Sequence, residues 1–94
     1  MSDDIKAVTV RITGRVQGVG FRDWTQREAS RLGLTGWVRN EADGSVAALL
    51  MGSEAAVAAM LQLLHEGPSY SRVDGVVSEA AVVVELPSDF RISH

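Results

Sequence analysis

The order in which strand and helix patterns alternate along the 94 residues is the feature that most restricts the fold. Residues 8–14 alternate β-branched apolar side chains with polar ones, and this period of two predicts a half-buried strand. Apolar residues then recur at helical spacing from Phe21 to Leu32, and Gly33 is a typical helix end. The chain is therefore expected to begin with a strand followed by a helix.

The middle of the sequence has the pattern of a hairpin followed by a second helix. The dipeptide DG at residues 43–44 is a turn signal between two strand-like runs, residues 36–40 and 45–51. We expect Gly52 to end the second of these strands and Ser53 to cap the helix that follows.

The last third of the chain is expected to return to strand structure. The Gly-Pro pair at residues 67–68 ends the second helix, and residues 73–86 form a long strand region with a bulge near Gly75. Pro87 closes that region, and residues 90–92 can add a short edge strand.

The predicted element order is thus β-α-β-β-α-β. Two helices on one face of an antiparallel sheet make the ferredoxin-like α+β sandwich, with a short fifth edge strand as an option. Residues 1–94 are enough for a single domain and leave no room for a second core. Because this fold carries many unrelated functions, the function must be read from a site.

Charge and cysteine content exclude several classes of protein. The net charge is −3, whereas a general nucleic-acid binder needs a positive surface, so no nucleic-acid partner is expected. The absence of cysteine excludes disulfides, thiolate metal sites and a cysteine nucleophile, and it fits a reducing compartment. The acidic residues are scattered, so we expect neither a metal site nor a cofactor.

Targeting and membrane segments are not expected either. The N-terminal stretch MSDDIK is acidic and lacks the apolar run of a signal peptide. The longest apolar runs, AALLM and AAVVV, are much shorter than a membrane-spanning helix. The sequence therefore predicts a soluble cytoplasmic protein with no membrane partner.

The segment GRVQGVGFR, residues 14–22, joins the first predicted strand to the first helix and carries three glycines. Helix N-termini bind anions, glycines let a ligand approach the backbone, and the arginine fork matches phosphate oxygens. The segment lacks the lysine of a Walker A loop and the third glycine of a dinucleotide fingerprint. The residues predict a site for a small, doubly charged oxyanion, but a plain glycine turn beside a surface arginine explains them equally well.

The three motifs GRVQGVGFR, GWVRN and DGSV, in this order and spacing, resemble the acylphosphatase family. The resemblance runs from about Val8 to Val77. It implies the ferredoxin-like fold and an enzyme that hydrolyses the carboxyl-phosphate anhydride of small acyl phosphates to a carboxylate and inorganic phosphate. Water would attack in line at phosphorus.

The resemblance also implies roles for particular residues. The family's catalytic arginine and asparagine correspond to Arg22 and Asn40, and the asparagine would hold the attacking water. The phosphate-binding loop, acting through its backbone N–H groups, corresponds to Arg15, Val16, Gln17, Gly18, Val19, Gly20 and Phe21. The side chain of Arg15 is equally compatible with a solvated surface position. We expect His65 to be non-catalytic, because no nucleophile or carboxylate lies at useful spacing from it.

The alternative function is a non-catalytic ferredoxin-like module that binds phosphate or carbamoyl phosphate, as a similar domain does within some large proteins. An RNA-recognition domain would need aromatic residues on its central strands, and a heavy-metal carrier would need cysteines. The chain ends with the domain, which favours a free-standing enzyme, as do Arg22 and Asn40. A monomer is the default expectation for a chain of this size.

Overall fold

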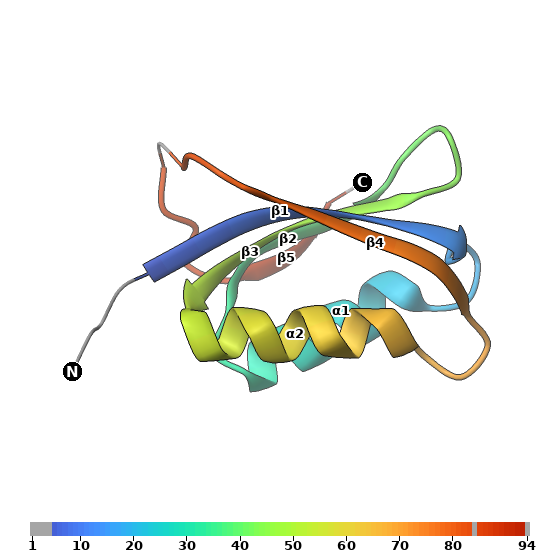
Figure 1. Ribbon diagram of the computed structural model, residues 1–94, viewed down its shortest axis with the longest axis horizontal. Helices are drawn as coiled ribbons and strands as arrows, with labels where there is room; N and C mark the ends of the chain where they lie inside the picture. Colours follow the sequence, from blue (N-terminus) through green and yellow to red (C-terminus); the bar gives the residue numbers. More distant parts are fainter. Residues whose placement is uncertain (1–4, 84, 94) are drawn as a thin grey trace.

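The computed structural model describes residues 5–83 and 85–93, in which strands and helices alternate as the sequence predicts. In chain order the elements are β1 (Ile5–Arg15), α1 (Phe21–Arg31), β2 (Thr35–Asn40), β3 (Val46–Ser53), α2 (Glu54–Glu66), β4 (Arg72–Ala80) and β5 (Phe90–Ser93). The five strands form one sheet in the order β4-β1-β3-β2-β5, and both helices cover the same face of it (Figure 1). The ferredoxin-like α+β architecture is thus confirmed, including the extra edge strand.

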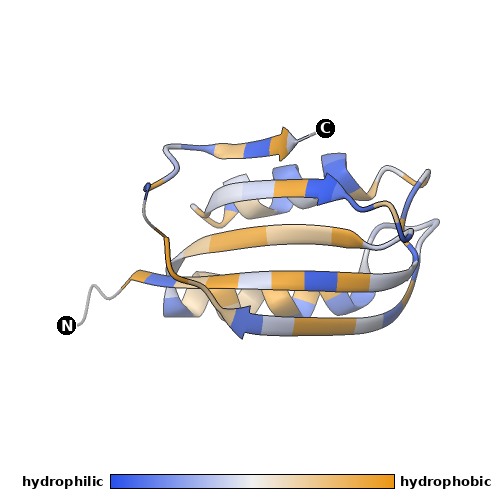
Figure 2. Ribbon diagram, turned by 90° about the horizontal axis from the view of Figure 1, so that it is seen from above, coloured by the Kyte–Doolittle hydropathy of each residue, from blue (hydrophilic) through white to orange (hydrophobic). Residues whose placement is uncertain are grey.

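The core lies between the sheet and the two helices. In β1, Val8, Val10 and Ile12 are buried against the helices, whereas Thr9 and Arg11 between them are exposed on the open face. The resulting alternation of hydrophobic and hydrophilic residues along the strands is visible from the open side (Figure 2). Buried apolar partners from the other elements include Phe21, Ala29, Val38, Leu50, Val57, Met60 and Leu64. The period of two in the first strand is therefore confirmed.

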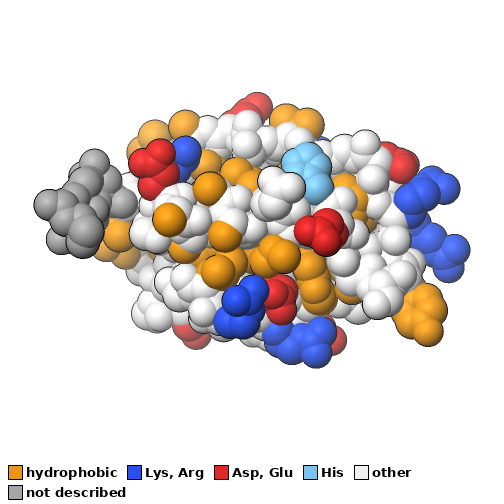
Figure 3. Space-filling view, turned by 60° about the horizontal axis from the view of Figure 1, so that its bottom comes forward, with side chains coloured by type: hydrophobic (Ala, Val, Ile, Leu, Met, Phe, Trp, Pro, Cys, Tyr) orange, Lys and Arg blue, Asp and Glu red, His pale blue; other side chains and the backbone are white. Residues whose placement is uncertain are grey.

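The helix-covered side of the molecule shows hydrophobic side chains separated by charged ones (Figure 3). In α2 the stripe formed by Val57, Met60 and Leu64 is turned into the core, so most of the apolar content of this helix is used in packing. No helix within residues 5–83 and 85–93 has the length and apolar character needed to span a bilayer.

The strand β3 continues through Gly52, where the sequence suggested a break. Gly52 lies opposite Lys6 of β1 and Ser53 opposite Ile5, because β1 begins early enough to give both residues a partner. The expected cap is confirmed, since the Oγ of Ser53 accepts a hydrogen bond of 3.1 Å from the N–H of Ala56.

The strand β4 is shorter than expected, ending at Ala80 rather than at residue 86. It lies at one edge of the sheet and pairs with β1, whereas β5 lies at the opposite edge beside β2. The chain must leave the sheet to reach that edge. There β5 runs parallel to β2, from Phe90 opposite Gly36 to Ser93 opposite Arg39, so the sheet is mixed rather than wholly antiparallel.

The bulge expected near Gly75 is present in the β1–β4 pair. Thr13 lies opposite Gly75 but Gly14 lies opposite Val73, so Asp74 is an extra residue on β4. A bulge of this kind bends the strands locally, and here it does so where β1 approaches the glycine segment.

We predict that Thr25→Val stabilises the protein. The Oγ1 atom of Thr25 is fully buried in α1 and has no hydrogen-bond partner among the described residues. Valine has the same shape and a similar helix propensity, so it removes the cost of burying an unpaired hydroxyl, about 1 kcal/mol. Urea unfolding should show this gain, while Thr9→Val on the open face should change the free energy by less than about 0.5 kcal/mol. A loss of stability in Thr25→Val would contradict the prediction.

Candidate active site

A pocket of about 330 Å³ lies where the glycine loop, residues 16–20, meets the first turn of α1 and the end of β2. Its lining consists of Val16, Gly18, Gly20, Phe21, Arg22, Asp23, Asn40 and Ile92. Arg22 and Asn40, which are far apart in the sequence, are therefore brought to one pocket together with part of the loop. Ile92 of β5 completes its wall.

Two glycines of the loop are required by the backbone conformation. Gly18 has φ of 75° and Gly20 has φ of 76°, the left-handed region that disfavours residues with a Cβ. A Cβ built on either would meet nothing within 4 Å, so packing does not explain why these positions are glycine. The loop backbone is consequently uncovered where it borders the pocket.

The N-terminus of α1 opens onto the same pocket. Gly20 is its N-cap, and no side chain caps the helix, while the N–H of Trp24 closes the first turn on the carbonyl of Gly20 at 3.1 Å. The earlier N–H groups of a helix have no acceptor within the helix and carry partial positive charge. With the half-buried Arg22 in the same turn, this geometry favours an anion in the pocket.

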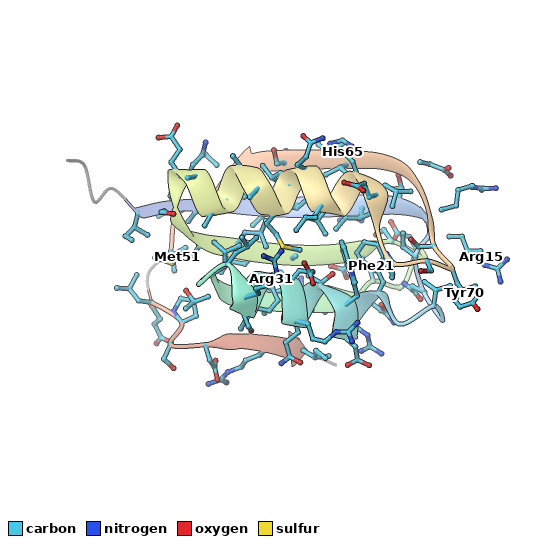
Figure 4. The ribbon with its side chains drawn as sticks, turned by 90° about the horizontal axis from the view of Figure 1, so that it is seen from below. Arg15, Phe21, Arg31, Met51, His65 and Tyr70 are labelled. Carbon is cyan, nitrogen blue, oxygen red and sulfur yellow. The ribbon has the colours of Figure 1, made fainter. Side chains whose placement is uncertain are left out.

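Buried side chains hold the loop at both ends. Val16 is 1% exposed and Phe21 is 2% exposed, and the Phe21 ring packs edge-on against Trp24 with centroids 5.4 Å apart. Phe21 points from the start of α1 toward α2 (Figure 4). Phe21 therefore belongs to the core and Trp24 packs against it, and the two rings fix the start of the helix that borders the pocket.

Strand alternation in β2 accounts for the position of Asn40. Val38 is fully buried on the helix side, while the guanidinium of Arg39 stacks on the opposite face, 4.5 Å from the ring centroid of Trp37. Arg39 also pairs with Glu41 at 3.1 Å, so its guanidinium has partners on the open face. Asn40, the last residue of the strand, lies two positions after Val38 and therefore on the same side of the sheet, where it borders the pocket.

The turn between β2 and β3 is held by a polar cluster next to the site. A carboxylate oxygen of Asp43 accepts hydrogen bonds from the hydroxyl of Ser45 at 2.6 Å and from its N–H at 2.9 Å. Arg11 donates to the other carboxylate oxygen and to the Ser45 hydroxyl, both at 3.0 Å. The pKa of Asp43 lies below its ordinary value. The largest cause is the hydrogen bond from the Ser45 hydroxyl, followed by the hydrogen bond from the Ser45 N–H.

We predict that the stabilisation contributed by Asp43 depends on pH. Because its pKa is lower in the folded protein, its contribution is complete above the unfolded pKa of about 3.9 and disappears as pH falls through the folded value. Asp43→Asn should therefore be less stable than the wild type at neutral pH, and the difference should shrink below about pH 4. Urea unfolding across this range measures it, and a constant difference would contradict the assignment.

Not every predicted loop residue borders the pocket. Arg15 is exposed and extends outward at the end of the molecule near Tyr70 (Figure 4), where positive side chains project from the surface (Figure 3). Val19 packs against the core. The side-chain amide of Gln17 donates to the carbonyls of Glu41 and Ser45, so it is directed at the neighbouring turn.

Two pocket residues were missed by the sequence analysis. Asp23 follows Arg22 in the first turn of α1, so its place beside the site could have been inferred from the motif. Ile92 could not, because its position depends on the parallel pairing of β5 with β2. His65 lies in the last turn of α2 and does not line the pocket.

A second hollow, of about 470 Å³, lies on the open face of the sheet and includes Arg11, Trp37 and Arg39 in its lining. Its two arginines are each paired with a carboxylate, Arg11 with Asp43 and Arg39 with Glu41. Both guanidiniums of this hollow thus have acidic partners, and its lining includes no residue of the glycine loop.

Comparison with known proteins identifies the family of the chain. A family model described as acylphosphatase matches residues 8–92. The chain is 59% identical over 93 residues to an acylphosphatase of Rhizobium etli, covering 99% of each chain. Its fold superposes on the acylphosphatase of Coxiella burnetii with a TM-score of 0.90 at 37% identity, over 96% of this chain and 94% of that chain. For the acylphosphatase of Bacillus subtilis the TM-score is 0.91 at 33% identity, over 97% and 100%. The chain therefore belongs to the acylphosphatase family and has that family's acid anhydride hydrolase activity.

Proposed function

We propose that the pocket at the glycine loop binds the phosphoryl group of an acyl phosphate and that Arg22 and Asn40 are its catalytic residues. The observation that carries the proposal is that both side chains border one pocket together with the backbone of Gly18 and Gly20. A fixed positive charge, a neutral amide and uncovered backbone N–H donors form a set suited to a phosphoryl group and a water molecule.

The loop backbone and Arg22 would hold the phosphoryl oxygens. Attack at phosphorus spreads negative charge over three equatorial oxygens, and fixed N–H donors stabilise that charge without reorganising. The donors are the backbone N–H groups of residues 16–21, and the Arg22 fork binds two oxygens at once. Of the residues first assigned to phosphate binding, Arg15 is supported least, because it belongs to β1, lies opposite Arg72 of β4 and does not line the pocket.

Asn40 would position the attacking water through its side-chain amide. The water oxygen forms a bond to phosphorus while the bond from phosphorus to the carboxyl oxygen breaks, and the carboxylate leaves with the electron pair. A carboxylate is stable as an anion, so this step needs no strong general acid. The proton of the water would pass to a phosphoryl oxygen of the substrate, since the side chain proposed to hold the water, Asn40, is an amide and cannot accept it.

The substrates would be small acyl phosphates of varied acyl portion, carbamoyl phosphate among them. Most of the polar groups at the pocket suit the phosphoryl group, whereas the side chain of Ile92 offers only apolar surface to the rest. Because most of the binding energy would come from the phosphoryl group, acyl phosphates with different acyl portions should bind similarly.

We also propose that residues 1–94 act as one monomeric domain in the cytoplasm. The described residues share one sheet and one core, which supports a single folding unit. The sequence contains no cysteine, which supports a reducing compartment.

Hydrolysis of benzoyl phosphate in ¹⁸O-labelled water, with a chelator present, tests the proposed reaction. Attack at phosphorus should place the label in inorganic phosphate and leave benzoate unlabelled, as mass spectrometry of both products would show. Label in benzoate would instead mean attack at the carbonyl carbon, and the roles proposed for Arg22 and Asn40 would then be wrong.

A further inference from the structure

The side chain of Gln17 joins the glycine loop to the turn that follows Asn40. Its amide nitrogen donates two hydrogen bonds of 2.8 Å, to the carbonyl oxygens of Glu41 and Ser45. Both protons of the amide group are therefore used, and two acceptors at fixed positions define the plane of the amide. Gln17 lies between Val16 and Gly18, both of which line the pocket.

The two acceptors belong to the two ends of one tight turn. The carbonyl of Ser45 also accepts from the N–H of Glu41 at 2.8 Å, and the carbonyl of Glu41 accepts from the N–H of Gly44 at 3.2 Å. Glu41 is bonded directly to Asn40. The position of this turn relative to the loop therefore sets the position of Asn40 relative to the loop.

The turn is also fixed from its other side. Arg11 in the centre of the sheet bonds both Asp43 and Ser45, and Asp43 bonds the N–H and hydroxyl of Ser45. Ser45 is 3% exposed, so the cluster is shielded where it meets the sheet. The turn is thus hydrogen-bonded to β1 through Arg11, and the Gln17 amide connects it to the loop.

Catalysis by positioning depends on the distance between the groups that hold the reactants, here the glycine loop and Asn40. A reacting group misplaced by about 1 Å can lower the rate about 100-fold. We propose that Gln17 is a positioning residue that sets the spacing between the phosphate-binding loop and Asn40. The inference rests on the water-holding role proposed for Asn40, and it assigns to the Gln17 side chain a role distinct from phosphate binding.

A double-mutant cycle on kcat for benzoyl phosphate tests it. Gln17→Met keeps the length of the side chain and removes both donors, so kcat should fall about 10- to 100-fold in the wild-type background. In the Asn40→Ala background the same change should lower kcat less than about twofold, because the group being positioned is gone. Gln17→Asn, shorter by one methylene, is expected to reach one carbonyl and keep part of the rate.

The matched control is Gln26→Met. The Gln26 amide donates to the carbonyl of Phe90 at 3.0 Å and joins α1 to β5, so its loss removes a similar hydrogen bond without touching the turn. It should lower the unfolding midpoint and leave kcat unchanged. If Gln17→Met and Gln17→Asn also lower only the midpoint, Gln17 is structural and the inference is wrong.

The cycle separates this inference from the proposed function. Should Asn40→Ala retain wild-type kcat, the catalytic role of Asn40 fails first. Should Asn40→Ala lose activity while Gln17→Met lowers kcat by the same factor in both backgrounds, the role of Asn40 stands and positioning through it is refuted.

Discussion

Arg22→Lys is expected to lower kcat/KM for benzoyl phosphate by about 10²- to 10³-fold, close to the loss in Arg22→Ala. Lysine keeps the charge, but a single ammonium cannot bind two phosphoryl oxygens in the fixed geometry of a guanidinium. Arg22 lies in the first turn of α1 and lines the pocket together with Gly18 and Gly20 of the loop. Steady-state hydrolysis by the purified variants gives the measurement.

Arg27→Lys is the matched control for this change. Arg27 lies on the exposed side of α1 and does not line the pocket, so the same substitution there should leave kcat/KM at the wild-type value. If Arg22→Lys hydrolysed benzoyl phosphate at a near wild-type rate, charge alone would suffice, and the geometric role of the guanidinium would have to be abandoned.

Asn40→Ala should lower kcat by about 10²- to 10³-fold while inorganic phosphate still binds as a competitive inhibitor. The amide is expected to act on water in the transition state, whereas the loop and Arg22 are expected to hold the phosphoryl group in the ground state as well. The loss should therefore appear in kcat rather than in KM. Initial rates at saturating benzoyl phosphate, together with the inhibition constant of phosphate, separate the two effects.

Gln62→Ala provides the comparison for Asn40→Ala, since it removes a side-chain amide from an exposed position of α2. It should leave both kcat and phosphate inhibition intact. A raised KM with unchanged kcat in Asn40→Ala would mean that the amide binds substrate instead of positioning water.

The strands and helices of the core were predictable because their patterns are local. Val8, Val10 and Ile12 alternate with polar residues, and Ser53 precedes a helical stripe, so each element could be read from its own residues. The end of β4 could not be predicted from the residues of that strand alone. The run of apolar residues beyond Ala80 has strand propensity, but the next strand lies at the far edge of the sheet, and this topology ends the pairing.

The candidate site was predictable to the extent that it is built from contiguous motifs. The backbone conformation at Gly18 and Gly20 follows from the motif, and the alternation in β2 gives the face of Asn40. The position of Ile92 depends on a parallel strand pair between distant segments, which no spacing in the sequence reveals. The two bonds of Gln17 depend likewise on where the β2–β3 turn lies relative to the loop.

The bulge at Asp74 affects how the β4 edge of the sheet can pair with a second molecule. Within the described residues β4 pairs with β1 alone, so its other side presents backbone groups that a second molecule could extend as an intermolecular sheet. The extra residue interrupts the regular spacing of those groups, and the charged side chains of Arg72, Asp74 and Glu79 are exposed along the strand. The same irregularity that bends the strands near the candidate site therefore also makes this sheet edge a poor template for a second molecule.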